Sequence, residues 1–149
     1  MRSQTLGLLV VLAGCAGDDP KAPTDTTDTA AMGLQIAGTW IDAFGGTHTI
    51  DETSWTQDYG YGAPWVFHVA AYDNDQAWLV AENDVANGYN ASLWSRFDWA
   101  WSGEVLYYCQ SAFDAPDQQS ARDAPPPDVS DLDVAGCGGF PWTTLSPSP

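Results

Sequence analysis

The feature that most constrains the fold of this 149-residue chain is a series of short β-type segments separated by turn residues. Apolar and polar residues alternate in these segments with the period of two that a half-buried strand requires. Turn signals such as Asp73-Asn74-Asp75 and Ser102-Gly103 stand between them. The expected strands are 38–41, 47–50, 54–57, 65–72, 76–81, 93–101 and 104–110. Evenly spaced strands with hairpin links predict an all-β fold, a small antiparallel meander that forms a barrel or a sandwich.

Two of these segments also assign side chains to faces. Along 65–72, one face is expected to hold Trp65, Phe67, Val69 and Ala71. Along 93–101, the face expected to turn toward the core holds Leu93, Phe97, Trp99 and Trp101, and the opposite face holds Trp94, Arg96 and Asp98.

Beyond Phe113 the sequence becomes rich in Asp, Ala, Gln and Pro and predicts an irregular C-terminal arm. One or two helical turns are expected over 116–123, with Asp114 as the cap. Pro125-Pro126-Pro127 ends this helix, and the segment 137–142 then returns to the body of the domain.

The first 14 residues have the layout of a secretory signal peptide: Arg2, an apolar run from Leu6 to Leu12, and two small residues. The four residues Leu12-Ala13-Gly14-Cys15 resemble the lipobox of bacterial lipoproteins. This resemblance implies that Cys15 carries lipid and anchors the protein to a membrane. The alternative is an ordinary signal peptide that ends at a chance cysteine.

Lipidation would place the protein in the cell envelope. Ala16 after the cysteine is compatible with the outer membrane, facing the periplasm or the cell surface. Residues 15–33 contain Asp, Pro, Thr and Ala with few apolar residues, and they predict a disordered acidic tether. Residues 34–149 are expected to form a single β domain.

The other two cysteines are expected to pair. If Cys15 carries lipid, Cys109 and Cys137 remain, and compartments outside the inner membrane favour disulfides. The bond would staple the C-terminal arm to the last predicted strand. Free thiols or metal ligands are the alternative, although the two cysteines lack Cys-x-x-Cys spacing.

The formal net charge of −16 excludes nucleic acid as a partner, because a polyanion is repelled by phosphates. The charge indicates either a solvated surface or attraction of divalent cations. No cofactor is expected. Calcium is an alternative at 73–75 and 128–133, which are rich in oxygen ligands but do not follow the EF-hand pattern.

Aromatic residues are the strongest functional signal. The rings that lie near predicted turns or opposite the expected core face are Trp55, Trp65, Trp78, Trp94, Tyr59, Tyr61 and Tyr89. Trp and Tyr combine an apolar ring with a polar atom, which suits stacking on sugar rings. The alternative is that these rings cover the ends of a small barrel or form its second apolar layer.

Catalytic signals are weak. His48 and His68 have no partner at a metal-binding or catalytic spacing, and His48 is expected to face solvent or to bond a neighbouring loop. Paired carboxylates could hydrolyse a glycan, but twenty acidic residues single out no pair. The residues therefore favour a non-catalytic binding or structural module, with a glycan or an envelope protein as partner. The alternatives are a small glycan hydrolase and a carrier of an apolar ligand.

Two resemblances to known families accompany this interpretation. Gly38-x-Trp40 is similar to the opening of lipocalin-like barrels, and it implies an up-and-down barrel closed at one end. The segments 44–50, 93–97, 106–109 and 136–140, which include Phe-Gly-Gly-Thr-His-Thr-Ile and Gly-Cys-Gly-Gly-Phe, resemble a group of uncharacterised Gram-negative bacterial lipoproteins. That resemblance implies location and a disulfide, and no activity.

Overall fold

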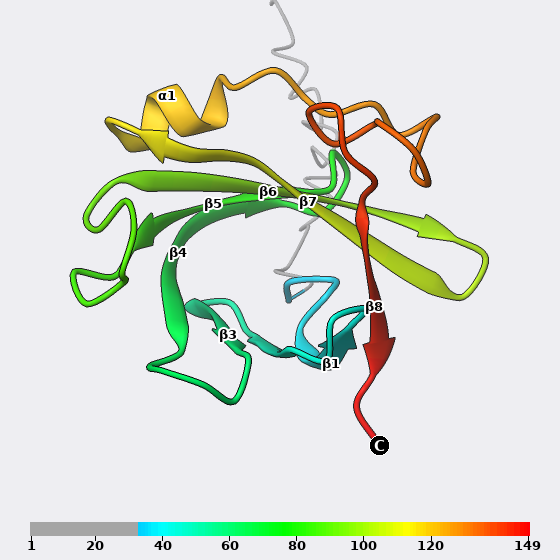
Figure 1. The fold of residues 1–149 in the computed structure, drawn as a ribbon. Helices are drawn as coiled ribbons and strands as arrows, with labels where there is room; N and C mark the ends of the chain where they lie inside the picture. The colour runs from blue at the N-terminus through cyan, green and yellow to red at the C-terminus, as the bar shows by residue number, and fades with distance from the viewer. Residues whose placement is uncertain (1–32) are drawn as a thin grey trace, which may run out of the picture. The chain divides into compact units, whose positions relative to one another are not determined.

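The computed structural model describes residues 33–149, so the predicted signal peptide, Cys15 and nearly all of the predicted tether lie outside the described residues. The elements are β1 (Gly38–Asp42), β2 (Thr47–Ile50), β3 (Ser54–Asp58), β4 (Trp65–Asp73), β5 (Trp78–Asn83), β6 (Trp94–Ser102), β7 (Val105–Ala115), α1 (Gln118–Arg122) and β8 (Thr143–Pro147). Figure 1 shows the strands around a common interior. Within 33–149, no helix combines the length and apolarity that a bilayer crossing needs.

The eight strands form one closed antiparallel barrel in sequence order. This confirms the predicted all-β meander and selects the barrel over the sandwich. β8 completes the ring, because Leu145 pairs with Leu106 of β7 and Ser146 pairs with Ile41 of β1. The sequence did not predict this strand, which lies at the end of the irregular arm. Without it, β1 and β7 would expose unpaired edges.

Hairpin connections alternate between the two ends of the barrel. We call the end with loops 43–46, 59–64 and 84–93 the mouth, and the opposite end the base. The chain enters at the base, where Leu34 and Ile36 are buried. The indole nitrogen of Trp40 donates a hydrogen bond to the Ile36 carbonyl at 3.0 Å, which holds this entry segment across the base.

Large rings fill the middle of the barrel. Trp55 and Phe97 are fully buried and stack with ring centroids 4.4 Å apart. Phe67 meets Phe97 edge-on at 4.9 Å, and Trp99 belongs to the same cluster. Side chains of this size bury large apolar areas and dominate the energetics of a small core.

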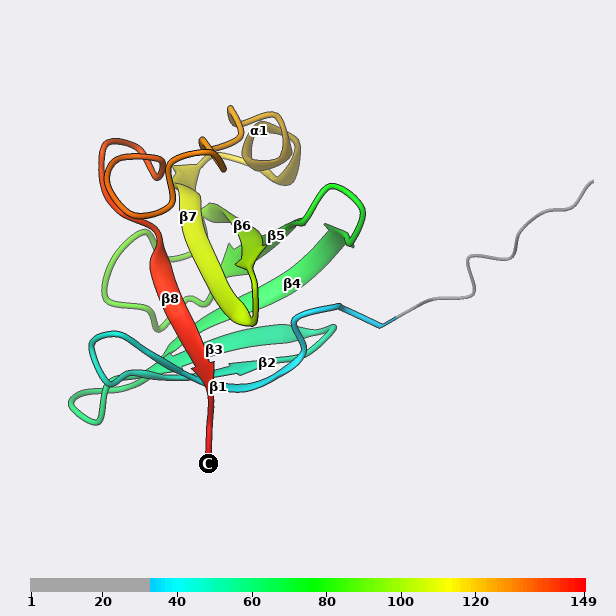
Figure 2. The same cartoon turned by 90° about the vertical axis from the view of Figure 1, so that its right-hand side faces the viewer.

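A second layer covers the outer face of β5, β6 and β7, where α1 and the arm lie together (Figure 2). Ala121 of α1 packs against Trp78. Arg96 is buried in this layer, forms an ion pair with Asp98 at 2.8 Å and donates to two carbonyl oxygens of the arm. The guanidinium groups of Arg96 and Arg122 both lie over the Trp78 ring.

Two local predictions are wrong. Asp117 caps α1 by accepting from the Ser120 backbone N–H, whereas the expected cap, Asp114, still belongs to β7. Ala71 does not share the face of Val69, because β4 shifts register between these residues. The shift turns Ala71 toward the outer layer.

The predicted disulfide is confirmed. Cys109 of β7 and Cys137 of the arm are bonded, with Cα atoms 5.6 Å apart and a sequence separation of 28. The chain-entropy model assigns a loop of this length about 3.5 kcal/mol of stabilisation. The bond fixes the arm against β7, and β8 follows directly from the arm.

Candidate ligand-binding site at the barrel mouth

Exposed apolar side chains gather at the mouth. Of the eleven large apolar side chains exposed in residues 33–149, six lie at this end: Phe44, Tyr61, Trp65, Val85, Tyr89 and Phe113. They come from three loops and two strands, so only the closed barrel brings them together. Contiguous exposed apolar groups of this kind mark interaction sites.

A cavity of about 220 Å³ opens among these rings. Its lining is Trp65, Phe67, Tyr89 and Phe113, with the amide side chains Asn83, Asn90 and Gln110. The rings of Trp65 and Tyr89 are 6.2 Å apart and inclined by 54°. The cavity therefore offers aromatic faces and neutral amides, and none of the side chains that line it is charged.

Hydrogen bonds fix the amides on one side of this cavity. Ser95 donates to Asn83 Oδ1 at 2.6 Å, and Gln110 Nε2 donates to Ser95 Oγ at 2.9 Å. Asn83 Nδ2 in turn donates to the carbonyls of Asn90 and Phe113. This chain joins β5, β6, β7 and the 84–93 loop, so the wall of the cavity is pre-formed.

A second polar chain lies inside β1, β2 and β3. Asp42 Oδ1 accepts from the backbone N–H groups of Phe44 and Gly46, both at 2.8 Å, and Oδ2 accepts from His48 at 3.1 Å. Trp55 Nε1 donates to His48 Nδ1 at 3.0 Å. Because an indole N–H only donates, Nδ1 must be the unprotonated nitrogen and His48 is the neutral Nε2–H tautomer.

Burial decides the direction of the pKa shift of His48, and hydrogen bonds decide that of Asp42. Burial lowers the pKa of His48, and the hydrogen bond to Asp42 does not offset it. Burial alone would raise the pKa of Asp42, but the hydrogen bonds from His48 and the backbone hold it below its usual value. The prediction that His48 faces solvent is wrong, because its side chain is fully buried inside the barrel.

Tyr59 and Tyr108 complete this polar region. Burial, reinforced by the charge of Asp42, raises the pKa of Tyr59 to about 12. Burial also raises the pKa of Tyr108. Both hydroxyl groups therefore stay protonated to a higher pH than the hydroxyl of an exposed tyrosine.

Gln57 is the one buried side chain in residues 33–149 with an unpaired polar atom, its Nε2. The side chain is only 4% exposed. Gln57 lies between His48 of β2 and Trp65 of β4 in the sheet, and it faces the interior like Trp55 two residues earlier. A buried donor without an acceptor costs about 1–3 kcal/mol, so it needs an explanation.

The structure divides the predicted aromatic residues into two groups. Tyr59, Tyr61, Trp65 and Tyr89 lie at the mouth. Trp55 is fully buried in the core, while Trp78 and Trp94 pack in the outer layer near α1. These three rings offer little or no free surface to a ligand.

Sequence reasoning missed several residues of the mouth. Asn83, Asn90, Gln110 and Phe113 line the cavity, and Gln57 lies beside Trp65. The available signal was a polar amide at the mouth end of a strand, where the alternating pattern would place an apolar residue. This signal can be interpreted only when the structure shows which strand ends lie together.

The acidic segments serve as turns. Asp73 accepts from the Gln76 backbone N–H, and Asp128 accepts from the Ser130 backbone N–H and hydroxyl. Across the described range, no three His, Cys, Asp or Glu side chains are grouped so that they could hold a metal ion.

Comparison with known proteins adds no information about function. No protein-family model, no curated protein sequence and no solved structure matches this chain.

Proposed function

We propose that the domain is a non-catalytic carbohydrate-binding module of the cell envelope, with its site at the barrel mouth. The observation that carries the proposal is the uncharged cavity lined by Trp65, Tyr89 and Phe113 together with three amides. A sugar ring has apolar faces that stack on aromatic rings and hydroxyl groups that exchange hydrogen bonds with amides. At about 220 Å³ the cavity suits one small ring.

The polar interior below the mouth supports this ligand class. Gln57, the ladder partner of Trp65, has a buried N–H with no acceptor within the protein, although Gln57 is not among the residues that line the cavity. A ligand hydroxyl or ring oxygen that reached past Trp65 would supply an acceptor, and a wholly apolar ligand would not.

The two alternative functions lack comparable support. A carrier of an apolar ligand needs an apolar chamber, but stacked Trp55 and Phe97 occupy the centre of this barrel. A glycan hydrolase needs two carboxyl groups across a cleft, and the residues lining the mouth cavity include no Asp or Glu.

Membrane anchoring through Cys15 is part of the proposal. It depends on the lipobox resemblance alone, since this residue lies outside the described residues. Mass spectrometry of the mature chain tests it, because a lipid on Cys15 adds the mass of its acyl chains and the Cys15→Ser variant would lack it.

A glycan array probed with the full chain tests the binding function. We expect saturable binding of neutral glycans that changes tryptophan emission, because Trp65 lines the cavity. Tyr89→Ala should weaken binding about tenfold, since one stacked ring contributes up to about 1.4 kcal/mol. The matched control is Trp101→Ala, which removes an exposed ring at the base. Equal losses in both variants, or no binding on the array, would contradict the proposal.

A further inference from the structure

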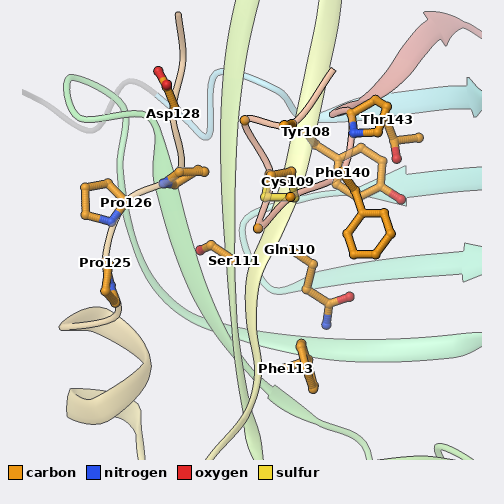
Figure 3. A pocket seen from close by; sticks show the side chains of 17 residues that line it. Tyr108, Cys109, Gln110, Ser111, Phe113, Pro125, Pro126, Asp128, Phe140 and Thr143 are labelled. Carbon is orange, nitrogen blue, oxygen red and sulfur yellow. A yellow bond between two sulfur atoms is a disulfide. The ribbon is translucent and has the colours of Figure 1, made fainter. Parts of the chain in front are cut away.

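A larger groove adjoins the mouth cavity. It has a volume of about 720 Å³ and lies between β7 and the C-terminal arm (Figure 3). One wall is β7 from Tyr108 to Phe113, and the other is the arm at 125–128 and 135–141. The Cys109–Cys137 disulfide joins the two walls.

The groove and the mouth cavity are adjacent. Gln110 and Phe113 line both of them. In Figure 3, Gln110 and Phe140 lie on the same side of β7, and Phe113 follows further along the strand. A ligand seated among Trp65 and Tyr89 would therefore reach the groove by passing Gln110 and Phe113, the two residues that both spaces share.

The edge of β7 is unpaired along this groove. β8 pairs with β7 only from Leu106 to Tyr108, although β7 continues to Ala115. Beyond Tyr108, β6 is the only strand of residues 33–149 that pairs with β7, and it lies on the other edge. The edge of β7 that faces the groove therefore has no strand partner there.

The lining matches the chemistry of the mouth. Phe113 and Phe140 are 54% and 72% exposed and supply ring faces. Gln110 and Thr143 supply an amide and a hydroxyl group. The one charged residue, Asp128, already accepts hydrogen bonds from Ser130.

We propose that the ligand is a linear neutral oligosaccharide, with one unit in the mouth cavity and the following units along the groove between β7 and the arm. This inference rests on the carbohydrate-binding function proposed above and names its substrate class. The groove is more than three times as large as the cavity, about 720 against 220 Å³, so most of the binding volume lies outside the mouth. The disulfide is then a wall of the binding site.

Chain length is the variable that tests this inference. The full chain is titrated with cello-oligosaccharides and chito-oligosaccharides of one to six units, followed by tryptophan emission and calorimetry. We expect affinity to rise at least tenfold from one unit to the longer chains and then to level off. Affinity that is the same for one unit and six units would overturn the inference and leave the mouth site intact.

Two ring variants separate the groove from the mouth. Phe140→Ala should abolish the gain with length while leaving the affinity for one unit unchanged. Tyr89→Ala should weaken binding of every length. The double variant Cys109→Ser/Cys137→Ser should resemble Phe140→Ala if the arm is a wall, provided that circular dichroism shows the barrel intact.

The remaining outcomes are also decisive. If no member of either series binds, the proposed function fails and this inference fails with it. If Phe140→Ala weakens binding of all lengths equally, the groove is not a separate subsite. If an unstructured peptide binds and Phe140→Ala abolishes that binding while glycan affinity is independent of length, the groove belongs to a protein partner.

Discussion

His48 and Gln57 are direct partners in the β2–β3 ladder, yet only one of these buried side chains has all its polar atoms hydrogen-bonded. Both ring nitrogens of His48 are bonded, to Asp42 and to Trp55. Gln57 Nε2 has no acceptor within the protein. This part of the sheet therefore contains His48, whose ring nitrogens are both hydrogen-bonded, and Gln57 next to the mouth, whose Nε2 is not. Mutations of these two residues should have different effects on stability.

His48 should make stability depend on pH. Because its pKa is lowered in the folded chain, the unfolded chain binds a proton near pH 6.5 that the folded chain does not. The free energy of unfolding then has its full value above about pH 6.5. It falls as the pH drops below that value, by up to about 1.4 kcal/mol per pH unit. Urea unfolding across this range measures the slope.

A histidine outside the core provides the control for that slope. His68 pairs with Asp84 and its side chain is 55% exposed. We expect His48→Gln to remove most of the slope near pH 6 and His68→Gln to retain it. If His68→Gln removes the slope and His48→Gln retains it, the assignment of the slope to His48 is wrong.

Gln57→Leu should stabilise the free protein while weakening ligand binding. The substitution removes an unpaired buried donor and keeps a similar volume, so the free energy of unfolding should rise by about 1 kcal/mol. Gln110→Leu is the control for the stability measurement alone: its amide donates to Ser95, so its loss should destabilise the fold, and Gln110 itself lines the cavity. Urea unfolding without ligand, followed by glycan titration, measures both effects.

Gly46→Ala should destabilise the polar region next to the mouth. A Cβ atom at Gly46 would lie 2.5 Å from the Tyr59 ring and 3.0 Å from Asp42 Oδ2. Relief of this overlap should cost about 1–3 kcal/mol of stability. Gly88→Ala adds the same methyl group where nothing lies within 4 Å, so its melting temperature should change little.

Loss of the disulfide should be costly. Cys109→Ser/Cys137→Ser releases the 28-residue loop and should lower the free energy of unfolding by about 3.5 kcal/mol. Reduction of the unmodified chain should lower the urea midpoint to that of the double variant. An unchanged midpoint would mean that the arm is held by its other contacts alone.

The sequence predicts strands well where apolar and polar residues alternate. In β6, Phe97 and Trp99 join the core and alternate with Arg96 and Asp98, as predicted, although Arg96 and Asp98 are also buried. Trp101, expected on the core face, is 43% exposed. β8 escapes prediction because Leu145 is its only fully buried residue and Pro147 ends it. Such a strand is specified by the edges of β1 and β7, which are distant in sequence, rather than by its own pattern.

Tryptophan positions show the same limit at the site. Trp55 and Trp65 both lie near the start of a strand that follows a turn, and their sequence contexts look equivalent. Trp55 is in the middle of the barrel beside Phe97, while Trp65 is at the rim, because the register of β3 and β4 places them at different depths. The depth of a residue along the barrel axis depends on how the strands pair. A local sequence pattern does not contain this information.

The chain enters the barrel at the base, the end opposite the mouth. Gly33 and Gln35 are tied to Asn74 in the turn between β4 and β5, at the end farthest from Tyr61 and Tyr89. The first described residues therefore lie at the opposite end of the barrel from the aromatic rim, so a ligand at the mouth would not have to displace them.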